Sequence, residues 1–153
     1  MKTVETIKDI FENTLKFHRY AAQFYQKLDV DSSNERTKML LNYMQRHHTD
    51  AVSELEKFTQ HTAEAVLNTW VQVTLEQSPE DFFNGLSFHS DMSHQEVGTL
   101  GQQVDTYLVN VYEELSEIAA TGELRAIFKN LMEMEVARKR QLSQAVNSLF
   151  REM

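Results

Sequence analysis

The chain has 153 residues and a formal net charge of −8, with four Gly, one Pro and no Cys. This length suits a single domain with a sizeable core, and the scarcity of turn-forming residues favours helices over sheets. The negative charge argues against nucleic acid and anionic membranes as partners, and the absence of Cys excludes disulfides and thiolate metal sites. No signal-peptide pattern or membrane-spanning apolar run is present, so we expect a soluble, cytoplasmic protein.

Apolar residues at helical spacing predict a first helix over residues 4–28. Its face consists of two adjacent stripes: Ile7, Ile10, Thr14, Phe17, Ala21, Phe24 and Leu28, and then Phe11, His18, Ala22 and Tyr25. So wide a face indicates a helix that contacts two neighbours. His18 lies on this face. The polar segment that follows ends the helix, and Ser32 with Glu35 matches a capping box for the next one.

A second helix is predicted over residues 33–60. Its core positions are Leu41, Met44, His48, Ala51, Leu55 and Phe58. Because the connection to the first helix is short, the two should run antiparallel. His48 falls at a core position.

Residues 61–93 form a long crossover with a short extra helix starting at Ser78-Pro79, where Ser can cap and Pro suits the first turn. Trp70–Thr74 fits either a helical turn or an extended segment. We expect Phe82, Phe83 and Phe88 to hold the crossover against the long helices.

A third helix is predicted over residues 94–120, with Ser93 and Glu96 as its capping box. Its core positions are Val104, Leu108, Val111, Leu115 and Ile118, with Asp105 and Tyr112 on the adjoining stripe.

The fourth helix, residues 123–150, has a seven-residue repeat of core positions: Leu124, Phe128, Leu131, Glu135, Arg138, Leu142, Ala145 and Leu149. Glu135 and Arg138 lie in the middle of this repeat, where an unpaired charge costs several kcal/mol.

The two halves of the chain repeat each other with a shift of 87 positions. The shift needs no gap and relates Tyr25 to Tyr112, Leu28 to Leu115, Leu41 to Phe128, Met44 to Leu131 and Leu55 to Leu142. It also relates His18 to Asp105, His48 to Glu135 and Ala51 to Arg138. Four coordinating side chains are therefore predicted at matching depth on four inward helix faces.

With this hairpin–crossover–hairpin order, the chain resembles the ferritin-like superfamily, especially rubrerythrin-like di-iron carboxylate proteins. The resemblance implies a Glu on two helices and a Glu-x-x-His pair on the other two. Here His18 and Asp105 stand at the single-Glu positions. The second helix has His48-Thr-Asp-Ala51 and the fourth has Glu135-Val-Ala-Arg138, so Glu135 alone matches the family pattern.

Three hypotheses follow for this altered site. In the first, Arg138 pairs with Glu135 and Asp105, the histidines complete a hydrogen-bond network, and the site has lost its metal. In the second, His18, His48, Asp105 and Glu135 bind one Fe, Zn or Mn ion while Arg138 turns aside. In the third, the site retains redox chemistry near Tyr25 or Tyr112.

The sequence therefore predicts an all-α, ferritin-like antiparallel four-helix bundle in one domain. Its expected function is non-catalytic binding or interaction with an unknown ligand, without a cofactor. The alternative is a metal-dependent oxidoreductase of the rubrerythrin type, with either one metal ion or a di-iron centre. The resemblance also implies a homodimer, for which the Met39, Met132 and Met134 flanks are the candidate surface.

Overall fold

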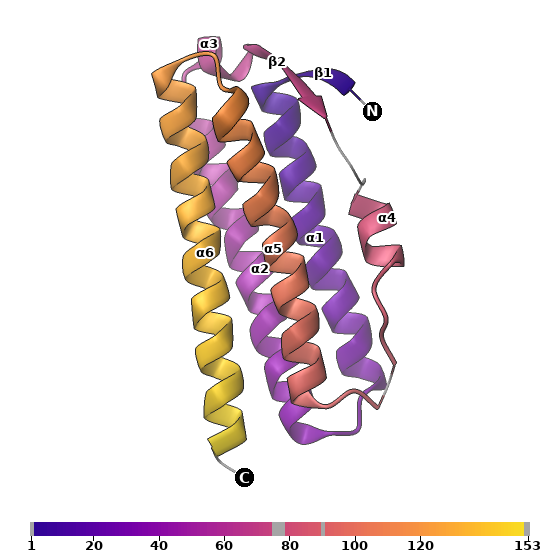
Figure 1. The fold of residues 1–153 in the computed structure, drawn as a ribbon. Helices are drawn as coiled ribbons and strands as arrows, with labels where there is room; N and C mark the ends of the chain where they lie inside the picture. The colour runs from indigo at the N-terminus through magenta and orange to yellow at the C-terminus, as the bar shows by residue number, and fades with distance from the viewer. Residues whose placement is uncertain (1, 75–78, 90, 152–153) are drawn as a thin grey trace.

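The computed structural model describes residues 2–74, 79–89 and 91–151 and consists mainly of helices, which confirms the all-α class. Four long helices lie side by side: α1 (Ile7–Asp31), α2 (Glu35–His61), α5 (His94–Ile118) and α6 (Gly122–Arg151) (Figure 1). Helix α1 packs along α2, and α5 packs along α6. No helix within the described ranges is long and apolar enough to cross a membrane.

The chain begins with a strand, β1 (Lys2–Thr6), so the prediction of a helix from residue 4 was wrong. β1 pairs antiparallel with β2 (Trp70–Thr74), and Val4 lies opposite Gln72. Both segments are rich in β-branched residues, which favour extended backbone once a partner strand is available. Thr6 then caps α1 by accepting a hydrogen bond from the Asp9 backbone N–H at 3.1 Å. Only the pairing with a distant segment reveals this strand.

The crossover is more varied than the single short helix predicted from the sequence. It contains α3 (Glu64–Leu67), β2 and α4 (Pro79–Asn84), and Trp70–Thr74 takes the extended alternative. The predicted cap Ser78 lies outside the described residues. Phe83 is 2% exposed and its ring contacts those of Phe17 and Phe24, so the crossover is held against α1 as expected.

The helix caps agree with the sequence at one site and differ at another. Ser93 and Glu96 form the predicted capping box at the start of α5. At α2, however, the cap is Asn34, which accepts a hydrogen bond from the Thr37 backbone N–H at 3.1 Å, so the assignment of Ser32 and Glu35 was wrong. Asn and Ser cap almost equally well, and the helix phase selects between them.

The core follows the predicted stripes of the four long helices. Phe11, Leu41, Leu108 and Phe128 are each at most 2% exposed. Ile118, predicted to be buried, is 43% exposed because α5 ends at this residue.

Helices α2 and α5 also approach each other, and Gly101 of α5 lies at their contact. A Cβ atom built there would lie 2.6 Å from Met44 Cε and 2.7 Å from Leu142 Cδ2. Cavities lie between other pairs of helices: one between α1 and α5, and one between α2 and α6.

Candidate functional site

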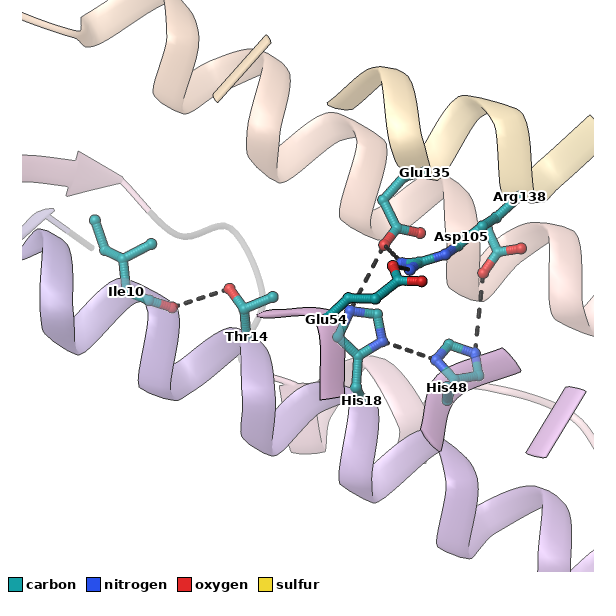
Figure 2. A network of polar contacts seen from close by, with 8 residues as sticks. All are labelled: Ile10, Thr14, His18, His48, Glu54, Asp105, Glu135 and Arg138. Atoms are coloured by element: carbon teal, nitrogen blue, oxygen red, sulfur yellow. Dashed lines mark hydrogen bonds and ion pairs between the residues drawn. The ribbon is translucent and has the colours of Figure 1, made fainter. Parts of the chain in front are cut away.

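A cluster of polar side chains occupies the middle of the helical core (Figure 2). We define the polar cluster as His18, His48, Asp105, Glu135 and Arg138. The first four are each at most 2% exposed, and each comes from a different long helix. The structure thus brings together all four side chains that the sequence placed at matching depth.

Contacts within the polar cluster form a continuous series across the four helices. His18 Nδ1 lies 2.9 Å from His48 Nδ1, which is hydrogen-bond distance. The outer nitrogen of each ring faces a carboxylate: His18 Nε2 lies 3.6 Å from Glu135 Oε1, and His48 Nε2 lies 3.9 Å from Asp105 Oδ1. These outer distances are too long for hydrogen bonds, so the outer contacts are electrostatic. The two outer contacts are equivalent in the repeat, because the 87-residue shift relates His18 to Asp105 and His48 to Glu135.

Arg138 supplies the positive charge of the polar cluster. Its guanidinium donates from Nη1 to Glu135 Oε1 at 2.8 Å and from Nη2 to Glu54 Oε2 at 2.5 Å. The sequence predicted pairing with Glu135 and Asp105, whereas the second carboxylate is in fact Glu54. Glu54 lies three residues after Ala51 on α2, on the helix face that points to Arg138. That spacing was the available signal for Glu54, and the sequence reasoning missed it.

Burial keeps both histidines of the polar cluster neutral. Desolvation, with a further contribution from Arg138, lowers the pKa of His18 to about 3. Desolvation and the neighbouring His18 lower the pKa of His48 well below its ordinary value. Each imidazole therefore has one N–H and one bare nitrogen near neutral pH.

The two carboxylates differ in protonation. Burial, reinforced by the charge of Glu135, raises the pKa of Asp105 to about 8, so this side chain is protonated at neutral pH. Burial also raises the pKa of Glu135, but Arg138 opposes that shift through its charge and its hydrogen bond. The permanent positive charge of Arg138, whose Nη1 lies 2.8 Å from Glu135 Oε1, favours the ionised form of Glu135.

These charges select one arrangement of protons along the series of contacts. Ionised Glu135 favours an N–H on His18 Nε2, which leaves His18 Nδ1 bare. His48 must then donate from its Nδ1, and its bare Nε2 faces protonated Asp105. Every contact in this arrangement is attractive, and the charges of Arg138 and Glu135 cancel within the polar cluster. Glu54, which also contacts Arg138, is exposed and lies outside the cluster.

The donor atoms are not arranged to coordinate a metal ion. Metal ligands direct their lone pairs at one point, whereas His18 and His48 direct one nitrogen at each other and the other at separate carboxylates. Arg138 occupies Oε1 of Glu135. Among the described residues, no group of three or more His, Asp or Glu side chains has the geometry to hold a metal.

Two spaces adjoin the polar cluster. A cavity of about 90 Å³ between α2 and α6 is lined by His18, Glu54, Glu135 and Arg138 among others. Glu135 Oε2 has no hydrogen-bond partner among the described residues. On the other side, a void of about 10 Å³ lies beside His48 and Asp105. The empty volume is thus larger at the end of the polar cluster that contains Glu135 than at the end that contains Asp105.

The two tyrosines of the third hypothesis lie within the same core. Tyr25 is fully buried, and its ring centroid lies 5.6 Å from that of His48. Burial raises the pKa of Tyr25 well above its ordinary value, with a contribution from Asp105. Burial likewise raises the pKa of Tyr112. Both phenols are therefore protonated at neutral pH.

Comparison of the chain with models of protein families, with curated proteins and with solved structures gives no match.

Proposed function

We propose that this protein is a ferritin-like four-helix bundle in which an internal cation, Arg138, has taken the place of a metal centre. Its function would be non-catalytic binding, without redox chemistry in the polar cluster. The observation that supports this proposal best is the contact of the Arg138 guanidinium with Glu135, the one acid that matches the family pattern.

The charge balance of the polar cluster gives a physical reason. A cation such as Fe²⁺ or Zn²⁺ needs deprotonated ligands, and here Asp105 is protonated at neutral pH while Glu135 is already paired. Adding a divalent cation would require the loss of the Asp105 proton and the displacement of a permanently charged guanidinium. We therefore place metal-dependent oxidation second to binding.

Metal uptake tests this proposal directly. The untagged protein is incubated anaerobically with Fe²⁺, or with Zn²⁺, passed through a desalting column and analysed for metal content. We expect substoichiometric metal for the wild type. Arg138→His removes the guanidinium and restores the Glu-x-x-His spacing, so this variant should retain more metal than the wild type.

Arg140→His is the matched control, because it adds an imidazole at an exposed position two residues further along α6. Stoichiometric uptake by the wild type, lost on His48→Ala, would overturn the proposal in favour of the metal-dependent oxidoreductase.

We also propose a homodimer, as the resemblance implies. Met39 and Met134 are 57% and 41% exposed, so both side chains are accessible to a second copy. Light scattering with size-exclusion chromatography would measure the mass, and a monomer at all concentrations would contradict the proposal.

A further inference from the structure

A cavity lies in the groove between α1 and α5, apart from the polar cluster. Its volume is about 290 Å³, close to the lower end of the range for small-molecule sites. Its walls come from α1, α5, the start of α4 and Glu5 of β1. The apolar side chains Ile10, Leu108, Val111 and Leu115 form much of its surface.

The crossover packs on α1 beside the cavity, and the first residues of α4 form part of the cavity wall. Phe83 packs on Phe17, Tyr20 and Phe24, and Phe88 packs edge-on against Phe24. In Figure 1, α4 lies against the side of α1, while β1 and β2 cross the end of the helices. The cavity-lining part of the groove has apolar walls, so it suits an apolar group of a ligand.

Aromatic rings form one side of this cavity. Phe17 and Tyr107 stack with ring centroids 4.9 Å apart and an interplanar angle of 10°, and both line the cavity. Tyr20, also a lining residue, is 39% exposed. Phe82 packs on Tyr107 and Phe83 packs on Phe17, so these rings form a flat apolar wall that suits the ring or short chain of a ligand.

The charged residues that line the cavity favour a cation. Glu5 and Glu80 contribute two carboxylates, against the single ammonium of the exposed Lys16. Glu5 also accepts a hydrogen bond from Asn13 Nδ2 at 3.2 Å, which fixes its carboxylate beside the cavity. The chain as a whole carries −8, which adds long-range attraction for a cation.

We propose that the cavity between α1 and α5 binds a small organic cation, an ammonium group attached to an apolar ring or short chain. The apolar part enters between Leu108, Val111 and Leu115. The ammonium group lies near Glu5 and Glu80. This inference rests on the proposed binding function and specifies its site and ligand class.

The test uses three probes that share one ring and differ in charge: phenethylammonium, phenethyl alcohol and 3-phenylpropionate. Their affinities for the full chain are measured by isothermal titration calorimetry at low salt. We expect the cation to bind at least about tenfold more tightly than the anion, with the alcohol between them, a difference equal to about 1.4 kcal/mol. Methyl NMR signals of Leu108, Val111 and Leu115 should shift on titration.

Substitutions locate the site independently. Glu80→Gln should weaken binding of the cation but not of the alcohol. Lys16→Gln should strengthen binding of the cation. Glu114→Gln removes an exposed carboxylate from α5 outside the cavity and is the matched control. Val111→Phe fills the cavity and should abolish binding of all three probes.

Equal affinity for the three probes would overturn the preference for a cation. Lack of binding by every probe at millimolar concentration, or binding that moves none of the three methyl signals, would overturn the site. Because Lys16 and Glu80 are exposed, their substitutions remain informative even if Val111→Phe does not fold. None of these results depends on metal uptake, so this inference can fail while the proposal about Arg138 stands.

Discussion

The two outer contacts of the polar cluster are equivalent in the repeat but opposite in their electrostatics. His18 faces Glu135, which is ionised and paired with Arg138, next to a cavity of about 90 Å³. His48 faces Asp105, which burial keeps protonated, next to a void of about 10 Å³. The difference arises at one pair of equivalent positions, Ala51 and Arg138. One guanidinium therefore decides which end of the cluster carries charge.

The largest effect is expected from removing that guanidinium. Arg138→Leu leaves Glu135 buried without its cation, which should reduce the free energy of unfolding by about 3–5 kcal/mol. Urea denaturation near neutral pH measures the change. Arg140→Leu alters an exposed arginine on the same helix and should have little effect. If both variants unfolded at the same urea concentration, Arg138 would not be the stabilising partner of Glu135.

The protonated side chain of Asp105 predicts an unusual dependence of stability on pH. Between pH 3.8 and about 8 the folded state keeps the Asp105 proton that the unfolded state releases, so stability falls as pH rises through this range. His18, His47 and His48 act in the opposite direction, because burial lowers the pKa of each below 6.5, so stability falls as pH decreases through this value. The histidines of the unfolded chain lose their remaining protons over about one pH unit above 6.5, so the Asp105 contribution dominates only above about pH 7.5. From there to about pH 8.5 stability should decline, by less than about 1.4 kcal/mol per pH unit.

Asp105→Asn tests this dependence, since it preserves the shape and removes the titrating group. Urea denaturation at several pH values from about 7.5 to 8.5 should show the decline in the wild type and a flatter profile in the variant. A wild-type stability that rises with pH over this range would mean that Asp105 is ionised in the folded state. Asp105 and Glu135 would then carry the same charge.

A smaller effect is expected from the close packing near the Asp105 end. Gly101→Ala places a methyl group against Met44 and Leu142, and overpacking outweighs the higher helix propensity of Ala for a net loss of about 1 kcal/mol. Gly122→Ala is the control, because no described atom outside its immediate neighbourhood lies within 4 Å of a Cβ built there. Thermal unfolding compares the two. Equal melting temperatures would show that the ends of the Met44 and Leu142 side chains move aside freely.

Much of the fold is predictable from the sequence because long amphipathic helices have a strong local signal. The apolar periodicity located all four long helices to within three residues at each end, and the Ser93 cap was visible as a motif. The 87-residue shift was enough to predict that His18, His48, Asp105 and Glu135 lie close together in the core. Residues at the same phase and depth of packed helices must meet in the core.

Tertiary structure alone decided the remaining features. Lys2–Thr6 became a strand because Trp70–Thr74 lies beside it, and pairing between distant segments leaves little trace in local sequence. Arg138 donates to Glu54 because α2 and α6 bring these two side chains together. From the sequence alone, Asp105 was the expected second partner of Arg138. The protonation of Asp105 and the ionisation of Glu135 depend on how each is buried and on where one cation lies. Sequence specifies which groups enter the core, whereas their charge follows from distances that exist only in the folded chain.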